Sequence, residues 1–287
     1  MANIEEKLWD ILKEIKALRT TDQRLPDGDY VENGLIHCGK CREPKEAIVA
    51  FFGKVPCMCK CESDAYRQEE ERRKEEEHRI TLQNKRGYCF DSVAMCNYTF
   101  EKCTAKDDPL YDVALQYAKN FSEMLRQGEG LTFFGNLGTG KTYFAASIAN
   151  DVIDQGYTAR MTNFSTIDSE IRNGDASAYI KELMKNDLLI IDDLDAERSS
   201  EYMQETVHNI IDRRHTTRKP LIVTTNLTSK ELKSRDDKAK SRIYSRLMDM
   251  TLPIEFNGED MREENLRQKY ARLKGLLHLP DKKKGTQ

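Results

Sequence analysis

The spacing of apolar and polar residues predicts distinct kinds of segment along the chain. Within residues 4–19, apolar side chains recur at helical spacing, which predicts an amphipathic helix that packs either on its own domain or in the groove of a partner. Residues 62–86 are almost all charged, and pairs such as Glu69 and Arg73 stand four positions apart in the favourable order. This stretch predicts a solvated helix that links two domains and ends at Gly87.

Short apolar runs in the rest of the chain predict β-strands. Five of them lie at residues 131–134, 158–164, 187–193, 221–226 and 252–256. The third contains four apolar residues in succession, which is typical of a strand buried on both faces in a parallel sheet. Helices are expected at residues 108–126 and 143–152, so this part of the chain is predicted to have an α/β fold. An earlier run at residues 47–52 also predicts a strand, with a turn at residues 53–54.

Composition narrows the classes of protein to consider. The 287 residues carry a net charge of −3 and are 33% charged, so there is no overall basic signal for nucleic acid. No apolar run approaches the roughly 20 residues of a membrane span, and the start of the chain lacks a signal-peptide pattern. We therefore expect a cytoplasmic protein without a membrane partner. Eight cysteines in that compartment favour metal ligands or free thiols over disulfides.

Five of the cysteines lie in two groups near the start of the chain. A C-x₂-C pair is followed about 16 residues later by three more cysteines, which is the spacing of a structural zinc ribbon. The predicted zinc ligands are Cys38, Cys41, Cys59 and Cys61, with Cys57 as the alternative to one of the last two. Reduced structural cysteines without metal are the other interpretation. A unit this small has little core, so a metal would supply much of its folding energy.

Residues 135–142 match the P-loop pattern G-x-x-x-x-G-K-T between a predicted strand and a predicted helix. The glycines let backbone N–H groups approach an anion, and the helix N-terminus adds partial positive charge. Lys141 is expected to reach the β- and γ-phosphates of ATP, and the Thr142 hydroxyl to bind Mg²⁺. The predicted phosphate-binding residues are Gly135, Asn136, Leu137, Gly138, Thr139, Gly140, Lys141 and Thr142.

Polar side chains end two of the later strands. Asp192 and Asp193 follow the third apolar run, and with a P-loop upstream Asp192 suits the role of holding Mg²⁺. Asp193 stands where a carboxylate that polarises water belongs. Asn226 ends the fourth strand, where an amide can orient the attacking water and sense the γ-phosphate. The alternative for Asn226 is an ordinary turn former.

Together these motifs resemble the DnaC, DnaI and IstB group of AAA+ ATPases. The resemblance extends over roughly residues 98–264, and it is carried by the P-loop, Ile-Ile-Asp-Asp-Leu at 190–194, Glu197-Arg198, Thr-Thr-Asn-Leu at 224–227 and Ser-Arg-Leu at 245–247. It implies a five-stranded parallel sheet with the P-loop strand central, and ATP with Mg²⁺ bound between neighbouring subunits of an open spiral. Asp193 departs from the usual glutamate, which shortens the reach of that carboxylate by about one methylene.

The resemblance also assigns roles to arginines and implies a DNA partner. Arg246 matches the arginine finger that would reach the γ-phosphate in the next subunit, with Arg242 as the second candidate. Arg262 matches the sensor 2 position, and each of these arginines could instead form a surface ion pair. Single-stranded DNA would contact the region of residues 158–172 and nearby lysines. The candidate side chains are Arg160, Asn163, Phe164, Arg172, Lys181 and Lys185.

The cysteine ribbon resembles that of DnaC-like helicase loaders and favours one function within the group. The expected protein docks on a replicative DnaB-type helicase through its N-terminal domain and assembles through its ATP-bound domain. ATP binding and slow, stimulated hydrolysis would then place the helicase on single-stranded DNA. The alternatives are an IstB-like transposition helper and an ATP-gated adaptor with little turnover. The predicted parts are a cysteine domain at 1–63, a charged linker at 64–88, an AAA+ domain at 89–278 and a disordered tail at 279–287.

Overall fold

The computed structural model describes residues 25, 28–194, 201–233, 238–258 and 260–277. The predicted amphipathic helix, the Glu197-Arg198 pair and the predicted tail lie outside the described residues. The chain divides into two compact units, residues 1–78 and 79–287, so the division falls within the stretch predicted as a charged linker. Among the described residues, no helix has the length and apolar character needed to cross a membrane.

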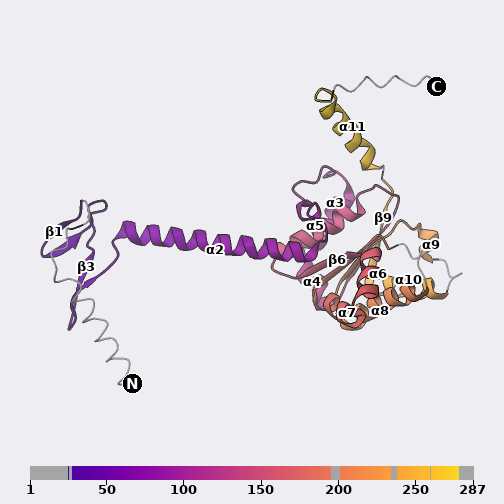
Figure 1. Ribbon diagram of the computed structural model, residues 1–287, viewed down its shortest axis with the longest axis horizontal. Coiled ribbons are helices and arrows are strands. Elements are labelled where there is room, and N and C mark those ends of the chain that lie inside the picture. The colour runs from indigo at the N-terminus through magenta and orange to yellow at the C-terminus, as the bar shows by residue number, and fades with distance from the viewer. Residues whose placement is uncertain (1–24, 26–27, 195–200, 234–237, 259, 278–287) are drawn as a thin grey trace. The chain divides into compact units, whose positions relative to one another are not determined.

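The first unit contains two antiparallel hairpins followed by the start of a long helix (Figure 1). Its elements are β1 Tyr30–Glu32, β2 Leu35–His37, β3 Glu46–Val49, β4 Gly53–Pro56 and α2 Lys60–Cys89. The strand predicted at residues 47–52 is too long, because β3 ends at Val49 and Gly53 already belongs to β4. Phe51 and Phe52 form the turn, and Phe51 supplies a positive φ of 71° that reverses the chain.

The helix α2 does not end at Gly87 as predicted, but continues to Cys89. Cys89 is fully buried, and the Phe90 that follows is 4% exposed. A glycine inside a helix costs about 1 kcal/mol relative to alanine, and burial of two apolar side chains at the end of α2 outweighs that cost. The packing of the second unit therefore sets where this helix ends.

The second unit is built on a five-stranded parallel sheet with the order β6-β7-β8-β5-β9. The strands are β5 Gly130–Gly135, β6 Ala159–Asn163, β7 Leu188–Asp192, β8 Leu221–Thr224 and β9 Thr251–Phe256. The five-stranded parallel α/β fold predicted from the sequence is confirmed. The P-loop strand β5 is not central, however, because β8 pairs with both β5 and β7 and occupies the middle position.

Helices cover both faces of this sheet (Figure 1). The described helices of this unit after α2 are η1 Met95–Asn97, α3 Pro109–Lys119, α4 Phe121–Gln127, α5 Lys141–Asp154, α6 Phe164–Asn173, α7 Ala176–Lys185, α8 Glu201–Thr217, α9 Ser229–Lys233, α10 Lys238–Met250 and α11 Met261–Lys274, of which α11 projects away from the sheet. The single helix predicted at residues 108–126 is divided at Asn120. Asp108 caps the first part by accepting a hydrogen bond from the Leu110 N–H, with Pro109 in the first helical position.

Successive side chains of β7 point to opposite faces of the sheet, so this one strand contributes to two hydrophobic cores. Leu188 and Ile190 belong to the cluster that includes α3 and α5, whereas Leu189 and Ile191 belong to the cluster that includes α7, α8 and α10. All four side chains are 0% exposed, as expected for successive residues that point to opposite faces of a covered sheet. The strand that leads to Asp192 is therefore held from both sides.

A buried arginine joins the starts of two central strands. Arg214 on α8 is 0% exposed and donates hydrogen bonds to the carbonyl oxygens of Asn186, Asp187 and Pro220. These carbonyls lie just before β7 and β8, so one guanidinium joins backbone groups at the starts of both strands. Burial lowers the pKa of Arg214 to about 10, and the group still carries its charge at neutral pH.

Candidate functional sites

The P-loop leaves β5 and reverses over three glycines with positive φ. Gly135, Gly138 and Gly140 have φ values of 113°, 74° and 94°. A Cβ atom on Gly138 would lie 1.8 Å from a carboxylate oxygen of Asp260, so both backbone conformation and space require glycine there. The loop ends at Lys141, the first residue of α5, and its backbone N–H groups thus adjoin a helix N-terminus.

Lys141 reaches back across the loop. Its Nζ donates to the carbonyl oxygen of Gly135 at 2.9 Å and also to that of Asn136, and the residue is 6% exposed. Burial lowers the pKa of Lys141, and the carboxylates of Asp193 and Asp192 oppose that shift. The ammonium group is therefore already placed among the groups that surround an anion, and phosphate oxygens could replace its carbonyl acceptors.

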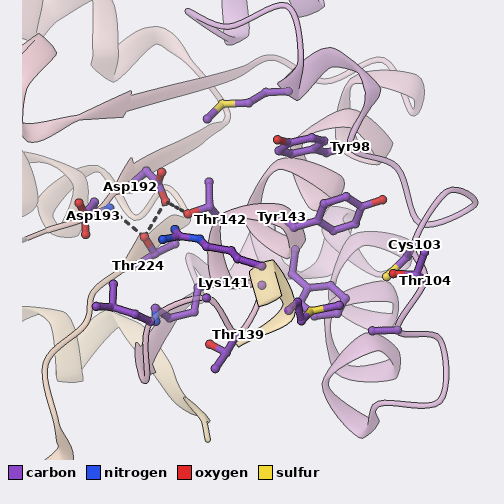
Figure 2. A pocket seen from close by; sticks show the side chains of 18 of the residues that line it. Tyr98, Cys103, Thr104, Thr139, Lys141, Thr142, Tyr143, Asp192, Asp193 and Thr224 are labelled. Atoms are coloured by element: carbon purple, nitrogen blue, oxygen red, sulfur yellow. Dashed lines mark hydrogen bonds between the residues drawn. The ribbon is translucent and has the colours of Figure 1, made fainter. Parts of the chain in front are cut away.

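The carboxylate of Asp192 meets two hydroxyl groups, one from the P-loop helix and one from β8. The Asp192 Oδ1 accepts hydrogen bonds from Thr142 Oγ1 at 2.9 Å and from Thr224 Oγ1 at 2.6 Å (Figure 2). Burial raises the pKa of Asp192, and the bonds from Thr224 and Thr142 partly offset this effect. A carboxylate and a threonine hydroxyl side by side are oxygen ligands of the kind that Mg²⁺ prefers, so these residues fit the predicted ion.

Asp193 and Asn226, for which the sequence predicts separate roles, lie in contact although they follow different strands. The Nδ2 of Asn226 donates to Asp193 Oδ1 at 2.8 Å. Asp193 has a left-handed φ of 53°, and its N–H donates to Thr224 Oγ1 at 2.8 Å. Because β8 lies between β5 and β7, Asn226 reaches the phosphate end of the site from the middle of the sheet.

Thr224 is a site residue to which sequence reasoning assigned no role. Its one hydroxyl donates to the Asp192 carboxylate and accepts the Asp193 N–H, so it fixes both acidic residues at once (Figure 2). The available signal was a hydroxyl-bearing residue two positions before Asn226, in the Thr-Thr-Asn-Leu motif. Periodicity alone gave no reason to prefer this threonine over Thr225.

A cavity of about 630 Å³ connects the P-loop and the acidic residues with a second group of side chains. That volume lies within the range of small-molecule sites. Sequence reasoning missed the far end of the cavity, which is lined by Met95, Tyr98, Lys102, Cys103, Thr104 and Ala105. Arg262 lines the cavity as well, because the Met261 N–H at the start of α11 donates to the Gly138 carbonyl at 3.0 Å.

The other two predicted arginines lie on α10, and neither lines this cavity. Arg246 places its Nε 3.2 Å from a carboxylate oxygen of Asp212 on α8, and both side chains are about two-fifths exposed, at 42% and 41%. Arg242 is exposed. Within one chain, therefore, no contact joins Arg246 to the described residues of the P-loop site, and its predicted role requires a neighbouring subunit.

Most of the side chains predicted to contact single-stranded DNA have partners within the chain. Those engaged in this way are Arg160, Asn163, Phe164, Arg172 and Lys185. Arg160 and Arg172 form ion pairs with Asp91 and Asp168, at 2.8 and 2.7 Å. Asn163 caps α6, Phe164 packs against the core, and Lys185 pairs with a glutamate of its own helix at 2.6 Å. Lys181 is exposed.

Four cysteines of the first unit converge as the sequence predicts. The sulfur atoms of Cys38, Cys41, Cys59 and Cys61 all lie within 4.8 Å of one another. Two of the sulfur–sulfur distances are 3.5 Å, from Cys38 to Cys61, and 3.3 Å, from Cys59 to Cys61. A tetrahedral zinc with bonds of about 2.3 Å needs sulfur separations of about 3.8 Å, so the cluster fits that ion. Cys57 is exposed and lies outside the cluster.

The surroundings of the cluster stabilise the thiolate form of two of its cysteines, which is the form that binds a metal ion. Backbone N–H groups directed at Cys38 and Cys41 lower the pKa of both thiols, to about 6 for Cys41. Such N–H contacts are typical second-shell support for thiolate ligands. Burial raises the pKa of Cys59 to about 12, so this thiol keeps its proton unless a cation displaces it.

Residues 90–269 match the family model described as IstB-like ATP binding protein. Among curated proteins, the uncharacterized protein YdaV of Escherichia coli is 28% identical over 160 residues, which are 52% of this chain and 62% of that protein. The replicative helicase loader DnaI of Bacillus subtilis is 22% identical over 181 residues, which are 57% of this chain and 58% of the loader. The chain thus spans about three-fifths of the length of each of these relatives.

A solved structure supports the fold. A crystal structure of DnaI aligns with 61% of this chain and 98% of its own length, at a TM-score of 0.51 and 21% sequence identity.

Proposed function

The chain belongs to the family of IstB-like ATP-binding proteins, and from this premise we propose that it is an ATPase that loads a replicative helicase onto single-stranded DNA. The observation that carries the proposal is the combination of two sites in one chain. One is a P-loop site that joins Lys141, Asp192 and Asn226, and the other is a separate unit with a four-cysteine cluster. The similarity to the helicase loader DnaI supports the same role.

The geometry of the first site suits ATP hydrolysis. Lys141 and the P-loop N–H groups would bind the β- and γ-phosphates, while Thr142 and Asp192 would hold Mg²⁺, which neutralises phosphate charge. The Asp193 carboxylate, held by Asn226 at 2.8 Å, would accept a proton from the attacking water and orient it toward the γ-phosphate. Asn226 fixes the carboxylate that binds this water, and Arg262 adds positive charge at the same end of the cavity.

We further propose that the subunits assemble and that Arg246 completes the site of a neighbour. Arg246 is already half-exposed and forms an ion pair with Asp212, which is also half-exposed, so little stability is lost when a phosphate replaces this partner. The test mixes Arg246→Ala subunits with Lys141→Ala subunits, each inactive alone. Mixed assemblies should recover hydrolysis, because some interfaces then pair an intact P-loop with an intact arginine. Absence of recovery in assemblies that contain both subunits would refute a role in trans.

The cysteine cluster is proposed to bind one structural zinc ion, and its unit to dock on the helicase. A closed set of four thiolates leaves no open coordination position, so the ion would stabilise the unit rather than act in a reaction. Because most of the side chains predicted to contact DNA are engaged within the chain, we assign DNA binding to the assembled loader and helicase. The DNA proposal rests on the named role of DnaI, not on a basic surface of this chain.

The test is capture of a purified DnaB-type helicase by the immobilised full chain, with ATP and Mg²⁺. Wild type should retain the helicase and increase the amount of it bound to single-stranded DNA, whereas Lys141→Ala should retain the helicase without loading it. If wild type captures no helicase with ATP and Mg²⁺, the loader function is wrong.

Membership of the IstB-like family leaves one other candidate, which we propose as the alternative: a transposition helper that delivers DNA to a transposase. The two functions use the same ATPase residues and differ in the partner that changes the rate of hydrolysis. Adding a transposase of the same replicon should stimulate hydrolysis if the chain is such a helper, and a helicase should do so if it is a loader. An adaptor with little turnover would bind ATP and show no stimulation by either partner.

A further inference from the structure

The cavity has a nucleoside end that the P-loop does not form. Met95, Tyr98 and Thr104 line the cavity, and Figure 2 shows Tyr98 and Thr104 across it from Asp192 and Asp193. The P-loop and Lys141 fix where phosphates bind. The sugar and base of a bound nucleotide must therefore occupy this remaining space, and residues 95–105 form its wall.

One buried amide holds this wall in place. The Nδ2 of Asn150 on α5 donates to the carbonyl oxygens of Met95 and Tyr98, both at 2.9 Å, and to that of Ala146 at 3.1 Å. Asn150 is 1% exposed, so water does not compete for these bonds. Tyr143, on the same helix, adds a bond from its hydroxyl to the Thr99 carbonyl at 2.9 Å.

The direction of that amide is set by α2. Arg86, near the end of α2, donates from Nε to the Asn150 Oδ1 at 3.0 Å and also pairs with Asp154. A guanidinium can only donate, so it requires the oxygen end of the amide to face it. The nitrogen end must then face Met95 and Tyr98. Without Arg86, only the carbonyl acceptors of the amide nitrogen hold it in this orientation, and the amide oxygen keeps no charged donor.

We propose that Arg86 and Asn150 are positioning residues for the nucleoside end of the site, so that the docking of the last turn of α2 controls nucleotide affinity. Both act through the backbone of residues 95 and 98. The inference rests on ATP binding, the property of the family, and is independent of helicase loading. If the chain fails to capture a helicase, the proposal for Arg86 and Asn150 still stands. If that proposal fails, the loader function still stands.

The neighbouring Lys85 provides a matched control. It also holds the end of α2, through bonds from its Nζ to the carbonyl oxygens of Gly156 at 2.5 Å and Tyr157 at 3.4 Å. Gly156 and Tyr157 do not line the cavity, and the bonds from Lys85 do not involve Asn150. Replacement of Lys85 therefore loosens the same helical turn without releasing the amide.

The experiment measures the affinity of the full chain for ATP and for inorganic tripolyphosphate, both with Mg²⁺, by titration calorimetry. Arg86→Ala should weaken ATP binding about tenfold, which corresponds to the loss of one hydrogen bond to a charged donor. Tripolyphosphate binding should not change, since that probe contacts only the P-loop end. Lys85→Ala should bind both ligands as wild type does.

Two further variants keep the test decisive. Arg86→Lys retains a donor and the charge, and should fold normally and lose less affinity for ATP than Arg86→Ala. In a double-mutant cycle, Asn150→Ala should add little to the effect of Arg86→Ala, because both act on one contact chain. The proposal is overturned if Arg86→Ala binds ATP as wild type does, if it weakens ATP and tripolyphosphate equally, or if Lys85→Ala causes the same loss.

Discussion

Replacing Thr224 by valine removes a hydroxyl that holds both acidic residues of the site. The side chain donates to the Asp192 carboxylate at 2.6 Å and accepts the Asp193 N–H at 2.8 Å. A hydrogen bond to a charged group contributes about 1.5–3 kcal/mol, and a bond between neutral groups contributes about 1 kcal/mol. The valine methyl leaves the Asp193 N–H without this acceptor, so its left-handed backbone loses a restraint.

These losses should act mainly on hydrolysis. Each 1.4 kcal/mol of lost transition-state stabilisation lowers the rate tenfold, so Thr224→Val is expected to hydrolyse ATP about 10- to 100-fold more slowly at saturating ATP and Mg²⁺. It should also need more Mg²⁺ for half-maximal rate, because the Asp192 carboxylate is no longer oriented. Single-turnover hydrolysis over a range of Mg²⁺ concentrations measures both effects.

Thr225→Val is the matched control. Its hydroxyl donates to the Leu194 carbonyl at 2.8 Å and is buried like that of Thr224, but Thr225 does not line the cavity. Both variants should lose similar amounts of unfolding free energy in urea, and Thr224→Ser should hydrolyse ATP nearly as wild type does. The reasoning is wrong if Thr224→Val retains the wild-type rate, or if Thr225→Val slows hydrolysis by the same factor.

Three further predictions concern the metal, the core and pH. By elemental analysis, Cys57→Ser should retain about one zinc ion per chain and Cys59→Ser should lose it, because of these two cysteines Cys59 alone belongs to the sulfur cluster. Arg214→Met should lose about 3–5 kcal/mol of unfolding free energy in urea, since the Asp187 carbonyl loses its guanidinium donor and those of Asn186 and Pro220 keep only longer bonds of 3.3 and 3.4 Å, while the exposed neighbour Arg213→Met should change little. Burial raises the pKa of Asp192 above 3.8, so the folded chain binds that proton more tightly than the unfolded chain, and stability falls as pH rises through the raised pKa. Without metal, Asp192→Asn should therefore be more stable than wild type at pH 7 in urea, with a difference that shrinks toward about pH 4, and a constant difference would contradict this.

The P-loop and the acidic strand end could be located from the sequence because their patterns are local. The P-loop needs glycines at fixed positions, and the apolar run before Asp192 is long enough to identify a strand covered on both faces. The same logic found the zinc-type cluster, since cysteine spacing limits which sulfurs can meet. It preferred Cys59 over Cys57, and the structure places Cys57 outside the cluster.

Features that depend on distant partners were not predictable from periodicity. Phe51 and Phe52 look like strand residues, yet they form a turn because the hairpin reverses there. Strand order is likewise invisible to local pattern, so the central place of β8 was missed. Arg160 looked free to bind DNA, but Asp91, which lies 69 positions away in sequence, pairs with it. Each of these features depends on which distant segments meet in the fold, and a single sequence does not contain that information.

The position of α5 makes the two ends of the cavity interdependent. The helix begins at Lys141 and Thr142, which are proposed to bind phosphates and Mg²⁺, and two to three turns later it carries Asn150, which holds the proposed nucleoside wall. A rigid helix cannot move one end without displacing the other, so a change at Arg86 must be felt either at the wall or along the whole of α5. The comparison of ATP with tripolyphosphate separates these cases. An effect confined to ATP means that the wall moves alone, as proposed, whereas an equal effect on both ligands means that α5 shifts as a body and carries the P-loop with it, which overturns the proposal.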